Sequence, residues 1–238
     1  MKYTPFLAML SLAIFTTSTT ADNNDWRANI DFSRADLNPF SMVLIKDGAE
    51  AGSMAYSIRR DGDTYVIEDR TEMVPNIIET ATGILDAKTL MPISVDIDFA
   101  VGDNRTVYDF KWNTGVLSGD VTINKSGTPE RIVPINSQDN AVLRMAVFGV
   151  ISALPLGDGF HTELPWFNTL SNKLETVQII HAGQETITTP AGVFEAHKVS
   201  LKGGSPENII YVSTSLPQKI IRIDVVGQPL HFERNPTS

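Results

Sequence analysis

The chain has 238 residues, a formal net charge of −9 and no cysteine. An acidic chain without clustered Lys and Arg does not match the phosphate backbone of nucleic acids or an anionic lipid surface, so we expect neither as a partner. The lack of cysteine excludes disulfides and lipidated cysteines, and stability must therefore come from packing.

The N-terminus has the pattern of a secretory signal peptide over residues 1–21. Lys2 precedes an apolar run that ends at Phe15, and small residues up to Ala21 offer a cleavage site. The run is shorter than the roughly 20 residues of a membrane-spanning helix. We expect a cleaved, periplasmic protein without stable membrane insertion, with an uncleaved anchor as the alternative. Cleavage removes one lysine and no acid, which takes the charge from −9 to −10.

Residues 22–238 are predicted to form one β-rich domain, in which residues 22–40 are a polar N-terminal lead. Glycine and proline are spread singly along the chain, and no low-complexity linker divides it. This length is sufficient for one sizeable core.

Short segments of alternating apolar and polar residues, separated by turn residues, predict antiparallel strands. They are 54–58, 64–68, 95–99, 106–112, 116–124, 174–180, 186–188, 193–201, 209–213, 220–226 and 230–234. Their regular spacing predicts a mainly β fold: an antiparallel barrel, half-barrel or sandwich. The Pro190–Gly192 turn between two of them is typical of a hairpin in which glycine takes a left-handed conformation.

One segment predicts a helix instead. Asp139 and Asn140 can cap it, apolar residues from Val142 to Leu154 cover most of its circumference, and Pro155 ends it. Such a helix must be buried, so we expect it on or in the sheet, either as plain core or as the wall of a ligand cavity.

Three blocks resemble the bacterial exported family known as domain of unknown function 3108. They are Ile45–Ser53, Thr82–Pro92 and the hairpin Thr189–Ala196, followed by Tyr211–Ser213 and Leu216–Ile220. Members of that family are envelope proteins of mostly unassigned function. The resemblance implies an exported β-rich domain and provides no catalytic residues.

Motifs that carry chemistry are scarce. The four histidines have no metal-ligand spacing, and neither a nucleophile elbow nor a phosphate-binding loop is present, so no metal and no cofactor are expected. Asp96 and Asp98 share one strand face, about 7 Å apart by strand rise, which is compatible with paired carboxylates acting on a glycan. His161 and Glu163 are weaker candidates for the same site, and ordinary solvent-facing positions are the alternative for all four.

Aromatic residues alternate along one predicted strand, at Tyr108, Phe110 and Trp112. This pattern is typical of core, but in a barrel too wide to be filled the same face lines an apolar cavity. Together with Phe148 and Ile151 of the apolar helix, these residues are the predicted ligand site.

Three functions remain open, and a catalytic role is the least favoured. The first is a non-catalytic periplasmic module that binds a hydrophobic, lipid-like or acyl-like molecule. The second is a module that binds another envelope protein through a sheet edge. The third is a carboxylate-dependent enzyme acting on envelope glycans.

Overall fold

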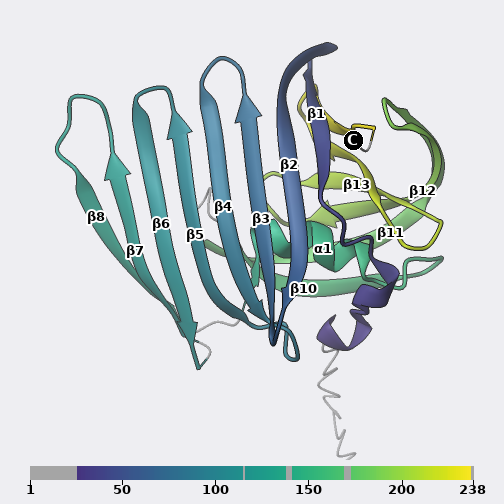
Figure 1. Cartoon of the computed structure of the whole chain (residues 1–238), viewed down its shortest axis with the longest axis horizontal. Helices are drawn as coiled ribbons and strands as arrows, with labels where there is room; N and C mark the ends of the chain where they lie inside the picture. The colour runs from purple at the N-terminus through teal and green to yellow at the C-terminus, as the bar shows by residue number, and fades with distance from the viewer. Residues whose placement is uncertain (1–25, 115, 138–140, 169–172, 237–238) are drawn as a thin grey trace, which may run out of the picture.

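The structure is a computed structural model that describes residues 26–236, except 115, 138–140 and 169–172 (Figure 1). The predicted signal peptide at 1–21 lies outside the described residues. The predicted helix cap at Asp139 and Asn140 lies outside them as well.

The described chain is built mainly of strands. They are β1 Phe40–Lys46, β2 Ala49–Asp61, β3 Thr64–Met73, β4 Ile77–Asp86, β5 Pro92–Val101, β6 Asn104–Asn113, β7 Val116–Asn124, β8 Arg131–Ser137, β9 Val142–Leu143, β10 His161–Asn168, β11 Lys173–Thr189, β12 Gly192–Lys202, β13 Asn208–Ser213, β14 Ile220–Val225 and β15 Leu230–Arg234. The helical segments are η1 Trp26–Asn29, η2 Phe32–Arg34, η3 Arg144–Ala146 and α1 Val147–Ser152.

All described strands belong to one sheet, in the order β8-β7-β6-β5-β4-β3-β2-β1-β15-β14-β13-β12-β11-β10-β9. Neighbours are antiparallel except β9 and β10, which run parallel. The pairing of β1 with β15 joins the two ends of the described chain. Strands β8 and β9 end the order without pairing with each other, so the sheet is not closed into a barrel. The predicted mainly antiparallel fold is thus confirmed in its open form.

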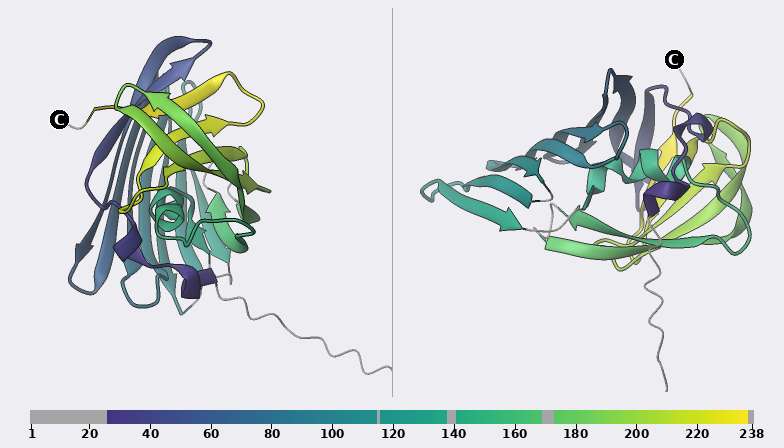
Figure 2. Two further views of the ribbon diagram at one scale, coloured as in Figure 1. Left: turned by 90° about the vertical axis from the view of Figure 1, so that its right-hand side faces the viewer. Right: turned by 90° about the horizontal axis from the view of Figure 1, so that it is seen from below.

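The sheet bends so that its two halves face each other across a core. Strands β1–β8 form a broad curved wall, β10–β15 curl opposite it, and α1 lies between them (Figures 1 and 2). Inward residues of β6 such as Tyr108, Phe110 and Trp112 are buried, whereas the residues between them, such as Asp109 and Lys111, are exposed. This alternation arises because successive side chains of a strand point to opposite faces.

Tight turns connect the strands where glycine was expected to reverse the chain. Gly62 and Gly102 have φ values of 59° in the β2–β3 and β5–β6 turns, and Gly192 has a φ of 128° at the start of β12. These positive angles are accessible to glycine at little cost. The sequence pattern did not predict β1, β4, β8, β9 or β10.

The predicted single helix over Val142–Leu154 is wrong in its first part. Val142 and Leu143 instead form strand β9, which pairs with Trp166 and Phe167 of β10. The backbone becomes helical only from Arg144 onward. Pairing with β10 satisfies backbone groups that a helix would otherwise satisfy, so tertiary contact decides between the two conformations.

The short helix α1 packs directly on the concave face of the sheet. The Gly149 amide donates to the Tyr56 hydroxyl at 3.3 Å, and a Cβ added at Gly149 would lie 2.9 Å from Ile58 Cδ1. The predicted burial of an apolar helix against the sheet is confirmed. None of the helices among the described residues has the length and hydropathy of a transmembrane span.

Candidate functional site

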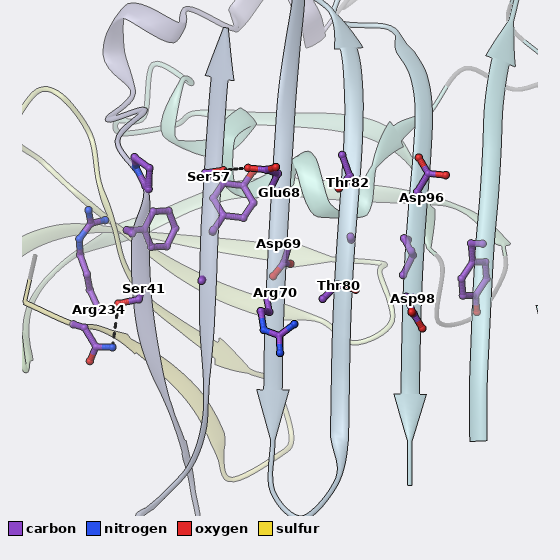
Figure 3. A pocket seen from close by; sticks show the side chains of 18 of the residues that line it. Ser41, Ser57, Glu68, Asp69, Arg70, Thr80, Thr82, Asp96, Asp98 and Arg234 are labelled. Atoms are coloured by element: carbon purple, nitrogen blue, oxygen red, sulfur yellow. Dashed lines mark hydrogen bonds between the residues drawn. The ribbon is translucent and has the colours of Figure 1, made fainter. Parts of the chain in front are cut away.

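The strand register arranges polar side chains in rows on the outer face of β2–β6. One row runs through Ser57, Glu68, Thr82 and Asp96, which are opposite one another on adjacent strands (Figure 3). Asp109 on β6 is opposite Asp96 and continues the row. Ser57, Glu68, Thr82 and Asp96 line, with their neighbours, an outer groove of about 680 Å³. The groove is polar, and most of the side chains in this row are exposed to solvent.

Several charged groups of this outer groove already have partners. Arg105 Nε donates to Asp98 Oδ1 at 2.7 Å, and this hydrogen bond together with the Arg105 charge holds the pKa of Asp98 below its ordinary value. The Ser57 hydroxyl donates to Glu68 at 3.1 Å. Burial raises the pKa of Asp96, and Asp109 opposite it raises this pKa further.

The other two weak catalytic candidates lie elsewhere, on β10. His161 Nδ1 is 3.3 Å from the Gly159 carbonyl oxygen, and Glu163 accepts a hydrogen bond from Gln178 at 2.6 Å. They line surface clefts with residues of β10 and β11, whereas Asp96 and Asp98 line the outer groove. The structure does not gather the four into one constellation.

A second hollow, which we call the inner cavity, lies between the two halves of the sheet. It has a volume of about 470 Å³ and is lined by the concave faces of β2–β5, by η3 and α1, and by β12–β15. Its walls are mostly apolar. Large side chains on the walls include Met54, Phe99, Met145, Phe148, Ile210 and Phe232.

One wall of the inner cavity carries four polar residues, which we call the polar cluster: Asp69 and Thr71 on β3, Glu79 on β4 and Arg144 on η3. Thr71 donates to Asp69 at 3.2 Å. Arg144 Nη1 lies 3.9 Å from Glu79 Oε1, and both side chains are largely buried. The cluster thus contains two carboxylates and one guanidinium.

One carboxylate of the polar cluster, that of Asp69, has a shifted pKa. Desolvation raises the pKa of Asp69 from 3.8 to about 7, and the neighbouring Glu79 contributes in the same direction. The Thr71 hydrogen bond and the Arg144 charge oppose this rise. Burial also raises the pKa of Tyr56, which is opposite Asp69 on β2.

The five predicted ligand-site residues are distributed around this cavity and in the core. Phe148 lines the cavity and packs edge-on against Tyr56, with ring centroids 5.6 Å apart. Tyr108 is a buried, inward residue of β6, and its pKa is raised by burial and by Glu79. Phe110 and Ile151 are 0% exposed and Trp112 is 8% exposed, so these three are packed core.

The sequence reasoning missed Asp69, Glu79 and Arg144. The alternation of β3 could have identified Asp69, because Tyr65, Ile67 and Asp69 are alternate residues of this strand and share one face. A carboxylate at an inward position is unusual because burying its charge is costly. Asp69 is therefore an exception to the apolar pattern of this face that the sequence alone could have shown.

A second buried polar pair lies away from the inner cavity. His181 Nε2 and His197 Nδ1 are 3.1 Å apart, and burial followed by the proximity of His181 lowers the pKa of His197. Over the part of the chain that the structure describes, no group of three or more His, Cys, Asp or Glu side chains is placed to hold a metal ion.

Fold and cavity together define the class of the protein: an open antiparallel half-barrel with a partly open, mostly apolar cavity that has a polar cluster in its wall. A family model described as a protein of unknown function, DUF3108, matches residues 37–231, and the chain belongs to this family. The three sequence blocks that carried the resemblance fall within the matched range. A search of curated proteins found no match, and neither did a search of solved structures.

Proposed function

We propose that this protein is a non-catalytic binding module of the bacterial envelope that holds a hydrophobic, acyl-like molecule in the inner cavity. The single observation that carries the proposal is an apolar hollow of about 470 Å³ at the centre of the fold. Cavities that bind small molecules measure about 300–1,000 Å³ and combine apolar walls with a few polar groups.

The size of the hollow favours a ligand over a packing defect. Protein interiors are close-packed, and voids larger than a water molecule are few and costly. A space lined by Phe99, Phe148 and Phe232 gains free energy when an apolar molecule displaces water from it.

The envelope location rests on two features of the sequence. Residues 1–21 have the composition of a cleavable signal peptide, and the family resemblance implies export. A module that shields an apolar molecule from water in the aqueous envelope space would need an apolar cavity of this kind. Fractionation of the native host, with N-terminal sequencing of the recovered protein, tests this location: protein that stays in the cytoplasm with residues 1–21 attached would contradict it.

Binding in the inner cavity is tested by placing a charge in its wall. Phe99→Asp should reduce the affinity for a fluorescent fatty-acid analogue by about tenfold or more, because the cavity must then accommodate a carboxylate. The matched control is Val101→Asp, two residues along the same face of β5, where the side chain is 41% exposed and lies outside the cavity.

Both variants should first be shown to retain the far-UV circular dichroism and cooperative unfolding of the wild type. Native mass spectrometry of protein purified from its own envelope should then show a copurified small molecule in the wild type and in Val101→Asp, and less of it in Phe99→Asp. Equal affinity in the two variants, or ligand-free wild type that also binds no analogue, would overturn the proposal. Copurification of a protein partner in place of a small molecule would favour the interaction module.

A further inference from the structure

We propose that the polar cluster of the inner cavity is a head-group site and that the ligand is a single-chain amphiphile with a cationic, amine-type head. This inference rests on the proposed function, because it assumes that the cavity holds a ligand. It adds the chemical class of that ligand.

The charge of the cavity lining favours a cationic head group. Of the residues that line the inner cavity, only Asp69, Glu79 and Arg144 carry charge. Arg144 can balance one of the two carboxylates and is nearest to Glu79, at 3.9 Å. With all three groups ionised, the described wall has one negative charge without a balancing cation. A monovalent cation is the head group that would neutralise it.

The position of this negative charge also favours a cationic head group. Asp69 is a half-buried residue of β3 that lines the inner cavity, where an unbalanced carboxylate is disfavoured. Three other groups approach it: Glu79 from β4 and Tyr56 from β2, which supply no positive charge, and Arg144 from η3. Thr71 donates one hydrogen bond to Asp69 Oδ1. An ammonium group beside Asp69 would supply both the missing charge and further donors.

The distribution of polar and apolar residues in the cavity favours a ligand with one polar end. The polar cluster occupies one wall, and the rest of the lining is mainly apolar, including side chains from β12–β15 on the opposite side. A molecule with one polar end and one apolar chain matches this division. An anionic head would instead add a negative charge beside Asp69 and Glu79.

If the head group pairs with Asp69, the affinity for the ligand should depend on pH. Because burial and Glu79 raise the pKa of Asp69 to about 7, the carboxylate is ionised above neutral pH and takes up a proton below it. A cationic head should therefore bind more tightly at pH 8 than at pH 5.5. A carboxylate head should show the opposite trend.

Three probes with one chain length separate the possibilities: decylamine, 1-decanol and decanoate. Isothermal titration at pH 8, below the critical micelle concentrations, should give decylamine an affinity about tenfold or more above that of 1-decanol, as for a charge-assisted hydrogen bond. Decanoate should bind most weakly. The ratio of amine to alcohol affinity should fall at pH 5.5.

Substitutions in the polar cluster test whether it causes the preference for the amine over the alcohol. Asp69→Asn should bring the ratio of amine to alcohol affinity to about one, and Glu79→Gln provides a second variant if the first does not fold. Glu68→Gln is the matched control, because Glu68 is the preceding residue, is exposed and points to the outer face. It should keep the wild-type ratio.

The outcomes distinguish this inference from the proposed function. If 1-decanol binds but the amine shows no advantage, if decanoate is preferred at pH 8, or if the advantage survives both cluster variants, the cationic head is wrong while the apolar cavity site stands. If none of the three probes binds the wild type, the cavity proposal and the head-group inference both fail.

Discussion

Asp69 places a carboxylate on a face of β3 that is otherwise mainly apolar. It is an inward-facing residue of β3, between Ile67 and Thr71 on the same face, and it lines the inner cavity. A position that satisfied only packing would be apolar, because a buried carboxylate loses its hydration. Packing alone therefore does not account for a carboxylate at this position.

Asp69 should make the protein less stable at high pH. Its pKa is about 7 in the folded state, against 3.8 as the ordinary value, so between these values the folded chain holds a proton that the unfolded chain has released. The contribution of Asp69 to stability is thus lost as the pH rises from about 4 to 7, by roughly 2–4 kcal/mol in total. Asp69→Asn should flatten this dependence and unfold at higher urea concentration than the wild type at pH 8.

Urea denaturation at pH 5 and pH 8 measures this difference. The exposed Glu68, changed to Gln, serves as the control and should keep the wild-type pH dependence. If Asp69→Asn loses as much stability between pH 5 and pH 8 as the wild type does, the Asp69 carboxyl group is not the cause of the pH dependence.

At the scale of elements, the segment β9–η3–α1 connects the two halves of the sheet. Leu143 of β9 packs on β4, Arg144 of η3 reaches Glu79, and Gly149 of α1 contacts Tyr56 and Ile58 on β2. The segment thereby forms one side of the inner cavity. Its position depends on small residues that allow a close approach to the sheet.

Gly83 of β4 should not tolerate a side chain. A Cβ there would lie 2.8 Å from Leu143 Cδ1 and 3.0 Å from Met145 Sδ, so Gly83→Val should push the segment away and cost about 1–3 kcal/mol. Valine favours strands more than glycine does, so a loss of stability would report the steric conflict. The control is Thr82→Val on the outer face of the same strand, and chemical denaturation compares the two. Equal stability of both variants would contradict the close packing.

At the scale of the whole molecule, a buried ion pair ties the N-terminal segment to the C-terminal strand. Arg234 of β15 lies 3.5 Å from Asp36, with side chains 5% and 6% exposed, and donates to the Ile220 carbonyl at 3.1 Å. Burial lowers the pKa of Arg234. Together with the β1–β15 pairing, this contact joins the two ends of the described chain.

Breaking this pair should be far more costly than breaking a surface pair. Arg234→Met leaves Asp36 buried without its cation and should cost about 3–5 kcal/mol, whereas adding Asp36→Leu should recover much of the loss. The matched control is Arg105→Met, which breaks the exposed pair with Asp98 and should cost less than about 1 kcal/mol. Thermal or urea unfolding of the four proteins provides the comparison. No recovery in the double variant would mean that Arg234, whose Cζ lies 4.8 Å from the centroid of the Phe40 ring, acts mainly by packing on that ring.

Local patterns in the sequence were sufficient to predict much of the sheet. Alternation located β6 and β12, turn residues located the reversals at Gly62 and Gly102, and three sequence blocks pointed to the family. These features depend on neighbouring residues, because the period of a strand and the conformation of a turn are set within a few positions.

Only the tertiary structure showed which face of each strand meets the other half of the protein. The split of the predicted helix at Leu143 depends on pairing with Phe167, and the polar cluster exists because β3, β4 and η3 converge on one wall. The sequence by itself determined most of the strands, the turns between them and the net negative charge of the chain. The cavity required the long-range pairing of β1 with β15, since the period of a strand defines two faces but not what each of them meets.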